Sequence, residues 1–366
     1  GCAGRGFSTQ GRSGYKGLMN RRKTGVRGNA PGLPRHDTSM MLPNRTKDDM
    51  IPRLIALALV AAVLALVLLV VRLAPAHPRG EGPLMARTAV GAVAAITFAL
   101  LAGDLLLGRG RMTMLSTLGL LPLDGGRFHG FGNVPFAIFA ASAFLLMSVL
   151  AAPFVARGRR TAAALVVGVV GLVTFVVDAW LGADGGGALA LIPSVGYLVL
   201  AVAGVRLTWA KVVAIGLATG VGFLAMAGAD WLRPEEQRTH LGRFFQSLLD
   251  GDAWGILVRK LETNVDLLLG PERAALLVPV VLVAVIWVLA RPGGAAGQRV
   301  QPLMSAYPGL RVGLIGLVVA LTVGFLLNDS GTAIPAAAAL VLAPALLVLW
   351  AGACLLYTSD AADDMQ

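Results

Sequence analysis

The chain has 366 residues, of which 56% are hydrophobic and 14% charged, and its formal net charge is +11. A soluble domain carries about 25% charged residues, so this composition excludes a soluble globular domain. The positive charge does not indicate nucleic-acid binding, because eleven of the 31 basic residues precede Leu54 and most others flank apolar runs. A nucleic-acid interface needs a basic stripe on a folded surface. We therefore predict an all-α, polytopic transmembrane helical bundle whose principal partner is the lipid bilayer.

The two ends of the chain differ in composition from the rest. Residues 1–49 are rich in Gly, Arg and Ser without apolar periodicity, and we expect them to be disordered or foreign to the membrane domain. Residues 354–366 resemble a translated sequencing-adapter tail, so the predicted transmembrane domain is 50–353. Both cysteines, Cys2 and Cys354, fall in these ends. The sequence therefore predicts no disulfide framework and no metal site, and it identifies no cofactor.

Nine apolar runs are long enough to be membrane-spanning helices, because a bilayer core about 30 Å thick requires about 20 apolar helical residues. None shows the alternation that marks the strands of a transmembrane barrel. The nine runs lie at about 51–73, 88–107, 134–156, 161–180, 188–205, 209–228, 274–290, 310–327 and 332–353. Pro193, Pro335 and Pro344 fall within these runs, and we expect them to interrupt the helices.

Basic residues in the connections predict which side of the membrane each connection faces. One alternate set carries eleven basic residues and a single acid, Glu81, and is predicted to be cytoplasmic: 72–87, 157–160, 205–211 and 291–311. The other set carries nine basic residues and eleven acids and is predicted to face outward: 108–133, 181–187, 229–273 and 328–331.

We therefore expect a multi-pass protein of a bacterial plasma membrane, with its N-terminus outside and its C-terminus in the cytoplasm. The basic N-terminal segment would then lie outside, against the rule. Either that segment is foreign, or the first apolar run is not an independent span.

The largest outward connection, 229–273, has the pattern of two amphipathic helices. Thr239 is placed to cap the first and Gly251 to end it. The apolar positions of the first helix are Leu241, Phe244, Phe245, Leu248 and Leu249, and those of the second are Trp254, Leu257, Leu261, Val265 and Leu268. Two placements remain open: on the outer membrane surface, or packed over the bundle.

Motifs of soluble enzymes are missing from the sequence. It contains no Walker loop, no His-Glu-x-x-His, no paired-cysteine zinc spacing and no Gly-x-Ser-x-Gly. Gly216 and Gly220 form a small-xxx-small pair, whose expected role is close helix packing. Whether the chain is an enzyme stays open at this level.

Polar residues gather in the outward connections. Their side chains can bind an ion or a polar group, and a carboxylate at membrane depth is costly unless paired or hydrated. Each also has a plainer interpretation: 328–331 as a turn and helix cap, a loop histidine as a solvated side chain, and Asp178 as an ion-pair partner of Arg127 or Arg243. The candidates for one shared outward-facing site are Asp104, Arg127, His129, Asn133, Asp178, Asp184, His240, Arg243, Asn264, Asn328, Asp329 and Ser330.

Four motifs occur in a fixed order, at 126–133, 182–187, 240–244 and 328–331. With the surrounding residues 85–350, they resemble the membrane half of uncharacterised multi-pass proteins of actinobacteria and firmicutes. In that family an extracytoplasmic domain similar to alkaline phosphatases and sulfatases precedes the spans. No such domain lies within this sequence, so the resemblance assigns no phosphate hydrolysis to it. It also transfers no catalytic residues, and His129 stands where the family has Tyr.

The leading hypothesis is a cell-envelope protein that binds a polar or phosphorylated envelope substrate at its outward face. Arg127 and Arg243 would hold a phosphate bidentately, His129 or His240 would carry a proton, and Asp329 would orient the substrate. The protein could present that substrate to an attached phosphatase-like domain.

Three other functions are compatible with the sequence. A polyprenyl-linked glycan transferase or ligase would use an outward acid such as Asp104 or Asp178. A secondary transporter would use the interrupted helices, although the sequence has no clear internal repeat. A membrane anchor and scaffold would need no site at all.

Overall fold

The computed structural model describes residues 81–115, 130–182, 184–269, 276–328 and 331–363. All regular secondary structure within these ranges is helical. The predicted span at 51–73 and the segment 1–49 lie outside the described residues.

Seven helical stretches are long and apolar enough to cross a membrane, which fits a multi-pass membrane protein. They are α2 (Glu81–Gly103) continued by η3 (Asp104–Gly108), α4 (Asn133–Ala156), α5 (Arg160–Phe175) continued by η5 (Val176–Leu181), α6 (Gly185–Val202), α7 (Trp209–Trp231), α12 (Leu310–Leu327) and α13 (Ala333–Asp363). Each corresponds to one of the nine predicted runs.

The predicted run at 274–290 has a different form from the others. It becomes α10 (Leu277–Ala290), which has 14 residues and is followed after a 73° bend by α11 (Ala295–Ala306). Counting this bent pair as one span gives eight among the described residues. The total of nine therefore stays a prediction.

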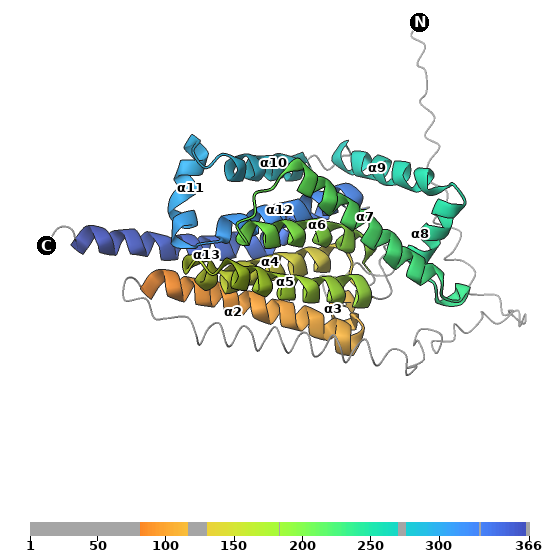
Figure 1. Ribbon diagram of the computed structural model, residues 1–366, viewed down its shortest axis with the longest axis horizontal. Helices are drawn as coiled ribbons and strands as arrows, with labels where there is room; N and C mark the ends of the chain where they lie inside the picture. Colours follow the sequence, from red (N-terminus) through yellow and green to blue (C-terminus); the bar gives the residue numbers. More distant parts are fainter. Residues whose placement is uncertain (1–80, 116–129, 183, 270–275, 329–330, 364–366) are drawn as a thin grey trace, which may run out of the picture. The chain divides into compact units, whose positions relative to one another are not determined.

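Helix α4 forms the centre of the bundle (Figure 1). It packs against α2, α5, α6, α12 and α13, and 89% of its most apolar 18-residue window is buried. Phe139 of α4 stacks on Phe98 of α2 with ring centroids 4.7 Å apart. An all-round apolar helix is typical of the core of a membrane bundle, and α4 is the element on which the others are assembled.

Small residues allow close packing of helices in the core, but not on α7. Gly313 of α12 lies against Ser148, and Gly316 lies against Phe144, so α12 approaches α4 closely. Gly216 and Gly220 of α7 have no atom within 4 Å of a Cβ placed there. The prediction that this pair mediates close packing is therefore wrong within the described chain. The surface of α7 instead exposes apolar side chains, as expected of a lipid-facing helix.

The prolines do not break the helices in which they lie. Pro193 is inside α6 and Pro344 is inside α13, while Pro335 occupies the first turn of α13, where its missing N–H is tolerated. The expected interruptions at these prolines are therefore wrong. The departures from α-helical geometry are instead the π-helical segments η3 and η5. In addition, α13 continues to Asp363, so helical structure does not stop at the predicted boundary at 353.

The connection 229–273 contains both predicted amphipathic helices, α8 (His240–Leu249) and α9 (Ala253–Leu269). The Thr239 hydroxyl accepts a hydrogen bond from the Leu241 amide at 3.2 Å, which confirms the predicted cap. Gly251 follows α8 with φ of +84°, where glycine is favoured. On α9, Trp254 and Leu261 are 73% and 65% exposed. The bundle therefore does not cover these two side chains of the apolar face of α9.

Candidate functional site

The four connections predicted to face outward are joined at one end of the bundle. The Phe131 amide donates to the Gly182 carbonyl at 2.9 Å, which ties the first connection to the second. Helix α9 is hydrogen-bonded to the residues after α12. We call this region the polar end, and its described residues are Asp104, Gly110, Gly130, Phe131, Asp178, Gly182, Asp184, Gly186, Gly187, Asn264, Asn328 and Gly331.

Two π-helical segments bring carboxylates into this end. Segment η3 begins at Asp104, and η5 includes Asp178. The two segments are in contact with each other, and both aspartates are buried, Asp178 completely. A π-helical turn adds a residue to a helix and changes the direction in which its side chains point, and such turns occur frequently at functional sites.

Asp104 has a structural role at the end of its span. Its carboxylate accepts hydrogen bonds from the Met112 amide at 3.0 Å, the Thr113 amide at 2.8 Å and the Thr113 hydroxyl at 2.6 Å. These bonds hold the turn that follows η3, where Arg109 has φ of +56°. Charge-assisted hydrogen bonds of this kind satisfy a buried carboxylate. We therefore assign Asp104 to the turn rather than to a ligand.

Asp178 and Asp184 lie beside the start of α6. Asp184 is fully buried and caps this helix, because its Oδ1 accepts from the Gly186 amide at 3.2 Å. A Cβ at Gly187 would overlap the Asp178 carboxylate. The glycine at 187 therefore allows the helix backbone to approach the Asp178 side chain.

Asn264 and Asn328 connect the amphipathic helix α9 to the end of α12. The Asn264 side chain donates to the Asn328 carbonyl at 3.0 Å and accepts from the Gly331 amide at 3.3 Å. The Asn328 side chain donates to the Gly324 carbonyl at 3.2 Å and contacts Gly186. Both asparagines are buried. They place α6, α9 and α12 around the same polar region.

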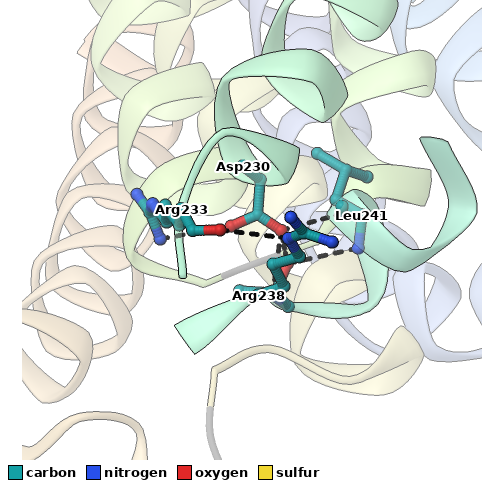
Figure 2. A network of polar contacts seen from close by, with 6 residues as sticks. Asp230, Arg233, Arg238 and Leu241 are labelled. Atoms are coloured by element: carbon teal, nitrogen blue, oxygen red, sulfur yellow. Dashed lines mark hydrogen bonds and ion pairs between the residues drawn. The ribbon is translucent and has the colours of Figure 1, made fainter. Parts of the chain in front are cut away.

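A second network surrounds Asp230 at the end of α7 (Figure 2). Its Oδ2 accepts from the Thr239 amide, the Thr239 hydroxyl and the Gly242 amide at 2.8–2.9 Å, and its Oδ1 pairs with Arg233 at 3.2 Å. Arg238 lies over the Trp231 ring at 5.4 Å. Asp230 is not among the residues predicted for the site. The sequence signal that could have identified it is an acid at the end of an apolar run, nine residues before the capping residue Thr239.

Several predicted site residues are not among the buried side chains of the polar end or are not described. Arg243 is exposed on α8, which packs against α7 and α9, and Asn133 is half-buried at the start of α4. His240 is the first residue of α8, and its side chain is not described. Arg127, His129, Asp329 and Ser330 lie outside the described residues. A phosphate clamp formed by Arg127 and Arg243 therefore stays a prediction.

The opposite end of the bundle carries basic side chains, and we call it the arginine end. Its described members are Arg87, Arg157, Arg159, Arg160, Arg206, Lys211, Arg291, Arg299 and Arg311. Arg311 at the start of α12 donates to the Leu289 carbonyl at the end of α10, at 2.6 and 3.1 Å. Tyr307, which precedes α12, is buried, and burial raises its pKa to about 12 although Arg87 acts in the opposite direction. This phenol is therefore neutral at physiological pH.

The fold and the polar end define a class of protein, an all-helical bundle that fits a multi-pass membrane protein. Within the described ranges, no group of three or more His, Cys, Asp or Glu side chains is arranged to hold a metal ion. Comparison of the chain with protein families, with curated proteins and with solved structures finds no match.

Proposed function

We propose that this chain is a membrane protein of the cell envelope that binds a polar substrate at its polar end. The observation that supports this most directly is the burial of the Asp178 carboxylate in η5, against the first turn of α6 and near Asn328. A carboxylate within an apolar bundle is costly, and such residues commonly mark substrate or ion pathways.

The chemistry of the described residues favours a hydroxyl-rich head group over a free phosphate. The polar end contributes the carboxylates of Asp178 and Asp184 and the amides of Asn264 and Asn328. Carboxylates accept hydrogen bonds from hydroxyls, amides donate and accept, and an anion would be repelled. A phosphorylated envelope substrate remains part of the proposal through Arg127, whose placement is not described, and through the exposed Arg243.

The surface helices fit the same proposal. The exposed apolar face of α9, with Trp254, Leu261 and Val265, would lie in the outer membrane interface. On the flank of that face, one turn from Leu261, Asn264 reaches the polar end. A lipid-linked substrate would meet α9 with its chain and the polar end with its head group. Presentation of that substrate to an attached phosphatase-like domain stays a proposal based on the resemblance.

No specific observation favours the three alternative functions. A glycan transferase would use an outward acid, and Asp104 is already occupied by three hydrogen bonds. A transporter would use interrupted helices near its site; the prolines do not interrupt their helices, and the bend between α10 and α11 lies at the arginine end. An anchor without a site gives no reason for the buried carboxylate of Asp178 in η5.

The test is ligand-dependent thermal stabilisation of the purified chain in lipid nanodiscs. The panel contains lipid-linked sugars, soluble sugar phosphates and inorganic phosphate. A bound ligand at a hundred times its Kd stabilises by about 2.7 kcal/mol. We expect at least one hydroxyl-rich lipid-linked head group to raise the unfolding temperature of the wild type, and Asp178→Asn to abolish that rise.

Asp266→Asn is the matched control, because Asp266 is an exposed carboxylate on α9 and should retain the full response. A panel that stabilises no form of the protein would contradict the proposed function. An equal response from Asp178→Asn would place the ligand elsewhere.

A further inference from the structure

A cavity of about 250 Å³ lies at the arginine end, far in sequence from the residues of the polar end. It is formed where α4 and α6 end and where α5 and α12 begin. Its apolar wall includes Val202 and Val312, and Arg160 contributes the charged side chain of the lining. The lining is therefore amphipathic, because the Arg160 side chain shares it with apolar side chains.

Three glycines shape this cavity. Gly158, Gly204 and Gly309 have φ of +68°, +76° and +91°, a region that favours glycine. A Cβ at Gly204 would overlap the Arg160 guanidinium. Because residue 204 is a glycine, the turn after α6 leaves room for the Arg160 guanidinium at the cavity.

The surroundings of the cavity are positively charged. Arg157, Arg159 and Arg206 are exposed in the adjoining connections, and 157–160 and 203–208 contain no acid. Within the described residues, Arg160 forms no ion pair. The positive ends of α5 and α12 meet the negative ends of α4 and α6 at the cavity, so the arginine side chains set the sign of its charge. An anionic group is therefore the complementary occupant.

The position of the cavity selects the kind of anion. It lies at the ends of candidate spans, where the membrane supplies phospholipid head groups. Farther along α5, Leu165 and Leu172 are 66% and 56% exposed, so this helix presents apolar surface to the lipid. Pockets for drug-sized ligands measure about 300–1,000 Å³, so this cavity suits a smaller group such as phosphate with glycerol.

We propose that the cavity binds the head group of an anionic phospholipid, with the Arg160 guanidinium donating to the phosphate. Basic pockets between transmembrane helices recognise anionic lipids in this way. The guanidinium fork matches two phosphate oxygens. This site is independent of the substrate proposed for the polar end.

The experiment is native mass spectrometry of the detergent-solubilised full chain, titrated with phosphatidylglycerol or with phosphatidylcholine. We expect the wild type to bind one phosphatidylglycerol with at least about tenfold preference over phosphatidylcholine. Arg160→Gln should weaken phosphatidylglycerol binding by about tenfold or more, the factor expected for losing a charge-assisted hydrogen bond. Arg160→Lys, which keeps the charge and loses the fork, should have an intermediate affinity.

Arg206→Gln is the matched control, because Arg206 is exposed at the same end but does not line the cavity, and it should bind like the wild type. Equal losses in Arg160→Gln and Arg206→Gln would reduce the effect to general surface charge and overturn the proposal. Displacement of the lipid by glycerol phosphate at equal concentration would identify a soluble phosphate as the occupant, and this too would overturn it.

Discussion

The polar end and the arginine end of the bundle differ in how their charged side chains are held. At the polar end Asp104, Asp178 and Asp184 are buried, as is Asp230 in the second network, and backbone amides donate to Asp104, Asp184 and Asp230. At the arginine end, Arg157, Arg159 and Arg206 are exposed, and so is Arg160 at the cavity.

The difference reflects the chemistry of the side chains. A short carboxylate in an apolar bundle must be met by donors, and helix starts and turns provide them. A long arginine side chain can pass along apolar surface and keep its charge at the membrane boundary. The positions of the acids therefore reflect packing inside the polar end. The positions of the arginines reflect the boundary of the membrane at the arginine end.

The largest expected effect tests on which side of the membrane the polar end and the arginine end lie. Single cysteines introduced as Glu262→Cys and Arg159→Cys, in a chain with both native cysteines replaced by serine, should be labelled differently. A membrane-impermeant maleimide should modify position 262 in intact cells and position 159 only after permeabilisation. Both positions are exposed, whereas Asp184 is fully buried and unsuited to labelling. The opposite labelling pattern would place the arginine end outside and the polar end in the cytoplasm.

The second-largest expected effect tests how much a buried acid stabilises the fold. Asp230→Ala removes three hydrogen bonds and an ion pair at one buried carboxylate. It should lower the free energy of unfolding by about 2–4 kcal/mol, measured by denaturant titration in mixed micelles. Arg233→Ala should cost less than about 1 kcal/mol, because that side chain is 44% exposed.

Asp266→Ala is the control for this measurement, because Asp266 is an exposed carboxylate on α9. If Asp230→Ala and Asp266→Ala lowered stability equally, burial would not separate the acids of the polar end from surface acids.

The smallest effect compares two glycines in different surroundings. Gly187→Ala would bring a methyl group against the Asp178 carboxylate and should destabilise by about 1–3 kcal/mol. Gly216→Ala meets no atom within 4 Å and should stabilise α7 by up to about 1 kcal/mol through helix propensity. The same denaturant titration measures both. A clear loss of stability in Gly216→Ala would instead mean that α7 packs against a second chain.

Much of the fold could be predicted from apolar runs and from local signals. Seven predicted spans correspond to helices, Thr239 caps α8 and Gly251 follows it in the left-handed region. These features depend on residues close together in the chain. The prolines misled the prediction, because Pro193 and Pro344 are accommodated inside continuous helices. The π-helical segments η3 and η5 have no simple sequence signal.

The candidate site was predicted only as a set of polar residues on one side. Their division into roles could not be predicted, because it depends on distances between helices. Asp104 is occupied by Thr113, Asn264 is joined to Asn328 across 64 residues, and Arg243 remains exposed. Asp230 was missed since its partners become neighbours only when α8 folds back on α7.

By itself, the sequence determined that the chain is helical and suited to a membrane, because hydropathy and the spacing of apolar residues are properties of each segment alone. Tertiary structure decided which carboxylates are buried against amide donors and which arginine lines a cavity. Those outcomes depend on how closely helices distant in sequence approach one another, and glycine positions and π-helical turns set that approach.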